Sequence, residues 1–595
     1  MTKDLASFYR SHYESTKTEL ASVKQKLTVS ALLKLAVGLI GIYLAFFTSL
    51  PLNYKIGIGL IVLAVFVILL KKHQKILRQR NICKAKNHLF QVEIDALNRN
   101  FETINNGLEY LDPMHDFAND IDIFGRNSLF QHTNRTQLKD GEKELTWLLL
   151  SNNTEQVVER QDAFKELAEL TDWRFDFTAR ASLTSKEKEH EKVSAWMGNY
   201  KRILPKNIKT LSYVYSILSI VAITGSIFDF LPDSIPYILF FTGLIITGVF
   251  FKKVTRFIAL TNKAHQVFSD YHKLFELIEN QTFSSTLLND ICAPIKNTNN
   301  KTASAEIKKY ASLLSSLDQR NNMIAAIFTN GFLLYEIRLT NQLEDWIEKN
   351  GKEVKRWLEV LAKMDAYNSL ANYVYNHPSY QFPEITDGNQ ILSTKNAAHP
   401  TMDPQKRIGN DIDIFKQDFL IITGANMAGK STFLRTVSMQ IVMGNIGLPT
   451  CGEETSYTPI KLITSMRSID SLNEETSYFF AELKRLKYIK EKVQDGNYFI
   501  ILDEILKGTN SKDKADGSKR FLKNLVNENL HGIIATHDLS LCELADEMEE
   551  IHNYFLDAEI IDDELHFDYK FKKGICQNMN ATFLLEKMEL VPRMK

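Results

Sequence analysis

A glycine-rich loop in the C-terminal third of this 595-residue chain carries residue types that bind nucleotide phosphates. Residues 424–432 read GANMAGKST, which fits the pattern G-x-x-x-x-G-K-S, and the apolar run FLIIT precedes them. A helical pattern follows, so backbone N–H groups and a helix N-terminus would surround the phosphates. Lys430 is expected to reach the β- and γ-phosphates of ATP, and Ser431 is expected to bind Mg²⁺. The candidate binding residues of the loop are Gly424, Gly429, Lys430, Ser431 and Thr432.

Two further apolar runs end in groups that hydrolysis needs. The run YFIILDE (498–504) ends in Asp503, which would complete Mg²⁺ coordination, and Glu504, which would orient and deprotonate the attacking water. A third run, IIATH, ends in His537, which would sense the γ-phosphate. An isolated histidine of this kind is more often structural, but here it accompanies the other two motifs. Because ligands of open α/β sheets bind outside the carboxyl ends of the strands, we expect one catalytic site containing Lys430, Glu504 and His537.

Length, charge and cysteine spacing limit the remaining possibilities. At roughly 150 residues per domain, the chain has room for about three to four domains. Its formal charge of -1 excludes a globally basic nucleic-acid binder, although a local basic patch stays possible. The five cysteines lie far apart, so neither a zinc site nor a disulfide framework is indicated. From residue 380 short apolar runs alternate with helical patterns, which predicts a parallel sheet with crossovers. Residues 255–290 and 303–376 have long helical patterns.

Four apolar stretches in two pairs predict two transmembrane helical hairpins. The first pair covers about 29–50 and 54–70, and the second about 210–228 and 235–251. A spanning helix needs about 20 mostly apolar residues, with about 17 the lower limit. A short turn joins each pair, and basic residues flank the outer ends of both. Positive flanks stay cytoplasmic, so we expect a multi-pass protein of the cell membrane whose termini and large segments are cytoplasmic.

Three other interpretations of these stretches are less favoured. Buried helices of a soluble protein rarely lack charged residues over such lengths. A cleavable signal peptide does not fit, because the segment before the first apolar run is 28 residues long and charged. A transporter would carry polar or ionisable groups along its path, whereas Lys34 is the only charged residue inside the stretches apart from Lys55 beside a turn. We therefore expect the helices to be anchors.

The motifs together resemble the ATPase domain of the MutS mismatch-repair family. The runs that carry the resemblance are TGANMAGKST, DEILKGTNS and ATHD, and SYFFAEL (477–483) is similar to the family's signature segment. The resemblance implies that Ser477 reaches the partner's nucleotide across a homodimer, and that Asn426 contacts phosphate in its own subunit. The Gly508-Thr509-Asn510 turn would lie at the same interface. ATP and Mg²⁺ are the implied cofactors, and the active form is expected to contain at least two chains.

The resemblance covers most of residues 112–590 and leaves out the second apolar pair. IDIFGRNSLFQHTNRT is similar to the start of the family's core and lever region, and LEVLAKMDAYNSLANYVYN to its end. The family's mismatch-reading domains would precede residue 112, where this chain has a hairpin and helical residues instead. The expected architecture is multidomain, with an all-α core and lever region and a C-terminal α/β P-loop ATPase domain of the ABC type. Its expected parts are an N-terminal helix with the first hairpin (1–80), a helical connector (81–111), the core and lever with the second hairpin (112–380) and the ATPase domain (381–595).

Three functions fit these features. The leading hypothesis is a membrane-anchored ATPase in which ATP binding closes a dimer and hydrolysis reopens it, with mismatched or otherwise unusual DNA as the second ligand in DNA repair. The main alternative is a mechanochemical switch that acts on a protein or lipid partner without mismatch recognition, which the missing reading domain favours. The third is a degenerate ATP-binding scaffold without turnover. In all three, four transmembrane helices contact membrane lipid.

Overall fold

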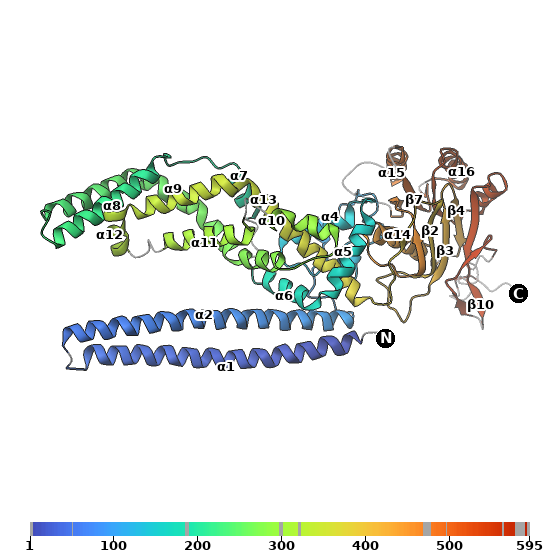
Figure 1. The fold of residues 1–595 in the computed structure, drawn as a ribbon. Coiled ribbons are helices and arrows are strands. Elements are labelled where there is room, and N and C mark those ends of the chain that lie inside the picture. Colours follow the sequence, from blue (N-terminus) through green and yellow to red (C-terminus); the bar gives the residue numbers. More distant parts are fainter. Residues whose placement is uncertain are drawn as a thin grey trace.

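The chain forms a helical body with a long hairpin beside it and a β-rich domain at its C-terminal end, as the computed structural model shows (Figure 1). The two helical pairs extend in the same direction, away from the β-rich domain. The structure describes residues 4–49, 51–184, 190–296, 301–318, 323–425, 427–467, 478–494, 497–507, 509–561, 564–577 and 590–591.

The first hairpin consists of α1 (Leu5–Phe46) and α2 (Leu52–Leu97), joined by a turn in which Pro51 precedes α2. Both helices extend far beyond the apolar stretches, since their charged halves continue to the body. The boundary predicted between residues 80 and 81 falls inside α2 and marks no structural division. The reason is local: residues 60–97 contain neither Gly nor Pro, so nothing interrupts the helix before its end at Leu97.

The second pair consists of α8 (Ile208–Ile227) and α9 (Ser234–Glu279), and α9 also continues past its apolar stretch into the body. Within the described chain, α1, α2, α8 and the Ser234–Thr261 part of α9 are long and apolar enough to cross a membrane, judged by length and composition.

The helical body is built around α13 (Tyr335–Asn376), which runs from the second apolar pair to the β-rich domain. Its buried side includes Trp346 and Trp357. The long helical pattern expected over 303–376 divides into α11, α12 and α13. The body's other helices are α3 (Leu129–Thr133), α4 (Lys139–Leu150), α5 (Val157–Glu169), α6 (Thr171–Ala181), α7 (His190–Gly198), α10 (Thr286–Lys296), α11 (Ala303–Asp318) and α12 (Met323–Leu333), with a short 3₁₀ helix at Leu108–Tyr110.

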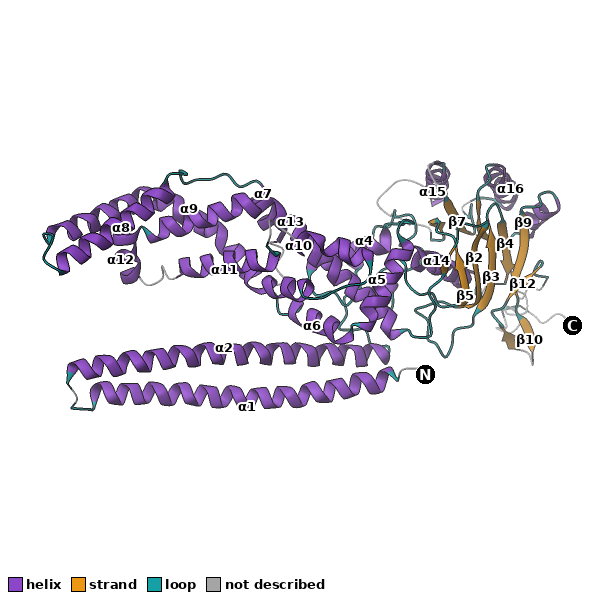
Figure 2. Ribbon diagram, in the orientation of Figure 1, coloured by secondary structure: helices purple, strands orange, loops and turns teal. Residues whose placement is uncertain are grey.

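A six-stranded sheet forms the centre of the C-terminal domain, in the order β12-β9-β4-β8-β7-β6 (Figure 2). All neighbours pair in parallel except β12, which is antiparallel to β9. β4 and β8 are wholly buried, as expected for strands covered on both faces. The strands are β4 (Phe419–Gly424), β6 (Lys461–Ser465), β7 (Tyr498–Asp503), β8 (His531–Ala535), β9 (Ile551–Leu556) and β12 (Phe571–Lys573).

Helices and a second, four-stranded sheet in the order β1-β5-β2-β3 complete this domain. Its strands are β1 (Glu384–Ile385), β2 (Gln390–Ala397), β3 (Asn410–Phe415) and β5 (Glu453–Tyr457), and a small ribbon pairs β10 (Glu559–Ile561) with β11 (Glu564–His566). The helices are α14 (Lys430–Ile446), α15 (Tyr478–Val493), α16 (Ser511–Asn527) and a 3₁₀ helix at Leu539–Asp546.

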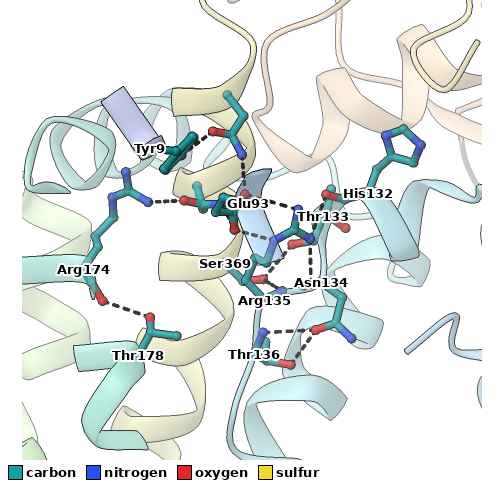
Figure 3. A network of polar contacts seen from close by, with 12 residues as sticks. Tyr9, Glu93, His132, Thr133, Asn134, Arg135, Thr136, Arg174, Thr178 and Ser369 are labelled. Carbon is teal, nitrogen blue, oxygen red and sulfur yellow. Dashed lines mark hydrogen bonds and ion pairs between the residues drawn. The ribbon is translucent and has the colours of Figure 1, made fainter. Parts of the chain in front are cut away.

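A buried polar network fastens the first hairpin to the body (Figure 3). Glu93 of α2 is 3% exposed and accepts from Arg135 Nε at 2.6 Å. Asn372 and Asn376 of α13 donate to the same carboxylate at 3.0 and 2.8 Å. Tyr9 of α1 donates to Asn376 Oδ1 at 2.5 Å. The Glu93 carboxylate therefore joins α2 to α13 and to the loop before α4, and Asn376 extends the network to α1.

The body is also hydrogen-bonded to α14 of the C-terminal domain at two places. Buried Arg160 of α5 donates to the carbonyl oxygens of Asn445 and Ile446 at 2.7 and 2.9 Å, at the negative end of the helix dipole. Nearer its start, Arg435 Nε donates to the Asp120 carbonyl oxygen at 3.1 Å. α14 begins at Lys430, so the same helix carries the end of the glycine-rich loop and the contacts with the body.

Candidate nucleotide-binding site

The glycine-rich loop joins the buried end of β4 to the first turn of α14. A Cβ on Gly424 would lie 2.4 Å from the carbonyl oxygen of Leu556 on β9, so only glycine fits there. Gly429 has φ +97°, in the left-handed region that favours glycine. Both glycines are thus required by the backbone itself. The loop leaves the N-terminal N–H groups of α14 directed at its own concave side, where an anion is favoured.

Lys430 is buried, with 7% exposure, and bends back onto the loop. Its Nζ donates to the carbonyl oxygens of Gly424 at 2.7 Å and Ala425 at 3.1 Å. Burial lowers the pKa of this ammonium, while Asp503 and Glu504 act in the opposite direction. Within the described chain no carboxylate lies within ion-pair distance of Lys430. A buried ammonium bonded to neutral oxygens fits a site that receives an anionic phosphate group.

The hydroxyl of Ser431 and the carboxylate of Asp503 meet at the end of the sheet, where Ser431 Oγ donates to Asp503 Oδ2 at 2.7 Å. They come from different elements, since Ser431 is in α14 and Asp503 ends β7. β8 lies between β7 and β4, and its last residue pairs with Asp503. A hydroxyl beside one carboxylate fits Mg²⁺, which usually takes few protein ligands and keeps phosphate oxygens and waters.

Glu504 and His537 face each other across the ends of β7 and β8, with Glu504 Oε1 2.9 Å from His537 Nε2. Glu504 has φ +48°, and its N–H donates to the Ala535 carbonyl oxygen at 2.9 Å, so the chain turns sharply out of β7. The hydrogen bond with His537 lowers the pKa of Glu504 to about 2, and the nearby Lys507 contributes. Glu504 is therefore ionised at neutral pH, as a water-orienting carboxylate must be.

The same nitrogen of His537 also lies 3.2 Å from Lys430 Nζ. Nε2 cannot donate to Glu504 and accept from Lys430 at once, because it carries either a proton or a lone pair. The shorter contact with an ionised carboxylate favours the protonated Nε2, so we assign the hydrogen bond to Glu504. His537 thus lies between the phosphate-loop lysine and the carboxylate that would hold water.

The remaining predicted residues divide into two groups. Thr432 is exposed in the first turn of α14, one residue after Ser431. Asn426, Ser477 and Gly508 lie outside the described residues, so their assigned roles stay predictions. The structure brings Gly424, Gly429, Lys430, Ser431, Asp503, Glu504 and His537 together at one edge of the sheet.

Two residues near the site received no role from the sequence. Glu482 of α15 accepts from the N–H groups of Leu506 and Lys507 at 2.6 and 3.0 Å, which fixes the turn that follows Glu504. Tyr569 borders the loop, because a Cβ on Gly429 would lie 3.1 Å from Tyr569 Cδ1. Sequence spacing carries no signal for either contact, since each joins segments distant along the chain.

Residues 420–592 match the family model of MutS domain V. The chain is 29% identical over 252 residues to the DNA mismatch repair protein MutS of Clostridium tetani, covering 41% of the chain and 28% of the relative. It is 28% identical over 254 residues to Endonuclease MutS2 of Carboxydothermus hydrogenoformans, covering 42% and 32%. The MutS protein homolog 4 of Homo sapiens is 28% identical over 224 residues, covering 36% and 24%. The chain thus spans no more than about a third of the length of these relatives.

Proposed function

We propose that this chain, whose membership in the MutS family is supported by its domain V and its relatives, is an ATP hydrolase anchored in a membrane. The observation that carries the hydrolase proposal is the convergence of three strand ends on one point. There His537 lies between Lys430 and Glu504, at 3.2 and 2.9 Å. Ser431 and Asp503, the chain neighbours of Lys430 and Glu504, are hydrogen-bonded to each other. Phosphate binding, metal binding and water orientation each have a separate side chain in this arrangement.

Each group has a defined part in the proposed reaction. Lys430 would exchange its two carbonyl contacts for phosphate oxygens of ATP. Ser431 and Asp503 would hold Mg²⁺, which supplies charge neutralisation at the transferred phosphate when it is bound. His537 Nε2–H would keep donating to Glu504 when Lys430 moves to the phosphate. With a pKa of about 2, Glu504 is a weak proton acceptor, so its main contribution would be to orient the attacking water.

Lys430→Ala is expected to weaken ATP binding about 10- to 100-fold, because one charge-assisted contact contributes about 1.5–3 kcal/mol. The measurement is equilibrium binding of a fluorescent ATP analogue to the detergent-purified full chain. Lys406→Ala removes an exposed lysine of the same domain and serves as the matched control, with affinity unchanged. Wild-type affinity in Lys430→Ala protein would remove the basis of the proposed site.

The hydrolysis cycle is proposed to run in a homodimer and to move the helical body. The resemblance that places Ser477 across a dimer supports the first part, and the bonds from Arg160 and Asp120 to α14 support the second. The four long apolar helices support a multi-pass location in the cell membrane, with lipid around α1, α2, α8 and α9. The basic flanks of both pairs favour cytoplasmic termini and a cytoplasmic ATPase domain.

DNA of mismatched or otherwise unusual structure is the proposed second ligand, by transfer from relatives named for DNA mismatch repair. The alternative is a mechanochemical switch that acts on a protein or lipid partner. It is favoured by one observation, namely that the far end of the body consists of exposed apolar helices at α8 and α9.

The two candidates differ in how binding to DNA responds to salt. For the DNA-repair function we expect mismatched or branched duplexes to bind more tightly than perfect duplexes, with affinity falling steeply as salt rises. The measurement is fluorescence anisotropy with the full chain in detergent at several salt concentrations, with and without ATP. Negligible binding to all three DNA structures would exclude the DNA function and leave the switch.

A further inference from the structure

Helix α12 presents an apolar face to the outside of the molecule. It is shorter than the four helices that are long enough to cross a membrane. Four of its side chains, Met323, Ile324, Ile327 and Phe328, are 75%, 71%, 43% and 56% exposed. Their spacing of three to four residues places them on one side of the helix. Contiguous apolar faces of this kind are uncommon on surfaces that contact water and usually mark a contact with a partner or a membrane.

The C-terminal half of α12 packs tightly on α9, at the level of the second apolar pair. A Cβ on Gly243 would lie 2.0 Å from the Gly331 carbonyl oxygen, so the two backbones are in direct contact. The Phe240 ring lies 5.7 Å from the ring of Phe328 and 5.1 Å from that of Phe332. Small residues at a close helix crossing are typical of helices packed inside a bilayer.

The exposed face of α12 is continuous with the exposed apolar face of α9. Phe240 touches Phe328, and Ile238 and Phe241 beside it on α9 are 63% and 61% exposed. Figure 1 shows α12 beside the paired helices α8 and α9, away from the β-rich domain. Whatever surrounds α9 at this level must therefore also surround α12.

The helix is interrupted between α12 and α13, at a residue that is buried. Leu334 has φ +47° and no exposed surface. The N–H of Glu336, in the first turn of α13, donates to the side-chain oxygen of buried Asn330 at 2.9 Å. An N–H at the start of a helix in water needs no such partner, whereas in a bilayer an interruption is tolerated only where protein groups satisfy the backbone.

Side chains of α8 approach the carbonyl oxygens at the end of α12 as well. The Tyr215 hydroxyl lies 3.2 Å from the Gly331 carbonyl oxygen, and Ser216 Oγ lies 3.0 Å from that of Leu333. Tyr215 is seven residues into α8, about 10 Å along the axis at 1.5 Å per residue. The end of α12 is thus well inside the apolar section of the pair.

We propose that α12 is a re-entrant helix, which enters the apolar layer of the membrane beside α8 and α9 and does not cross it. At 11 residues it is about 16 Å long, too short for an apolar core of about 30 Å. The face formed by Met323, Ile324, Ile327 and Phe328 contacts lipid acyl chains. Figure 1 shows α11 and α13, which both carry charged residues, on the side of α12 that faces the helical body. The inference rests on the proposed membrane anchoring of the second apolar pair.

The test places a single reporter on α12 in the full chain, reconstituted in liposomes of phosphatidylcholine and phosphatidylglycerol. Ile324→Cys and, as a second variant, Phe328→Cys are labelled with an environment-sensitive fluorophore. The five native cysteines are buried and free, so unsubstituted protein measures the labelling background. Quenching is recorded with lipids that carry a nitroxide near the middle of the acyl chain. Ile238→Cys on α9 is the lipid-facing control, and Lys309→Cys on α11 is the aqueous control.

We expect the labels at Ile324 and Phe328 to be quenched at least about half as strongly as the label at Ile238, with the Lys309 label unquenched. Labels on α12 that behave like the Lys309 label, while Ile238 is quenched, would overturn the re-entrant helix and leave the spanning pair intact. Cross-linking of two copies through Ile324→Cys without lipid quenching would overturn it in favour of a dimer contact. An unquenched Ile238 label would overturn the membrane anchoring itself, and the inference with it.

Discussion

Glu504→Gln is expected to lower kcat for ATP hydrolysis by about 10²-fold, because the attacking water loses the carboxylate that orients it and small misplacements of reacting groups cost about that much. Affinity for ATP should change little, because Lys430, Ser431 and Asp503 remain in place. The neutral amide keeps the shape of Glu504 but loses the charge that holds the contact with His537 at 2.9 Å. Single-turnover hydrolysis and filter binding of ATP, measured on the same preparation, separate the two effects.

The control for this substitution is Glu549→Gln, which makes the same chemical change at an exposed glutamate away from the sheet edge. Its kcat should match that of the wild type. The pH profile gives a further check: because the pKa of Glu504 is about 2, its protonation should not limit activity above about pH 4. If Glu504→Gln protein turned over ATP at the wild-type rate, Glu504 would have no role in orienting water. If the wild type and the Glu504→Gln variant both failed to turn over ATP, the degenerate-scaffold hypothesis would be supported.

Arg135→Met is expected to destabilise the docking of the first hairpin by about 3–5 kcal/mol, because it leaves Glu93 buried without its cationic partner. Arg135 Nε lies 2.6 Å from Glu93 Oε1, and the two side chains are 9% and 4% exposed. The loss should appear as roughly 10²- to 10³-fold faster hydrogen exchange in residues 82–97 of α2, since about 1.4 kcal/mol corresponds to tenfold.

A matched control lies on α2, the helix that carries Glu93. Lys86→Met removes a partly exposed ion pair with Asp176, whose atoms are 2.9 Å apart, and such pairs contribute about 0–1 kcal/mol. The double variant Glu93→Leu/Arg135→Met should lose less stability than the two single variants together, because no unpaired charge is left buried. Equal exchange rates in Arg135→Met and Lys86→Met proteins would show that the Glu93 network does not hold the hairpin.

Features encoded by neighbouring residues could be predicted from the sequence. The apolar runs FLIIT and YFIIL became β4 and β7, and the four apolar stretches lie in α1, α2, α8 and α9. The glycine-rich loop was recognisable for the same reason, since a strand, two glycines and a helix start are adjacent in the chain. Local composition sets such elements because each depends on hydrogen bonds and burial within a few residues.

Other features depend on residues far apart in the chain and could not be predicted from the sequence alone. Examples are the contact between Lys430 and His537, the shared carboxylate of Glu93, and the break at Leu334 that Asn330 and α8 satisfy. The sequence by itself determined which segments are helices, strands and candidate motifs. Only the tertiary structure decided which buried polar groups bond to each other. An unpaired polar group is costly to bury, so each needs a partner. Which partner it finds depends on how the elements pack, and not on the distance between the two residues along the chain.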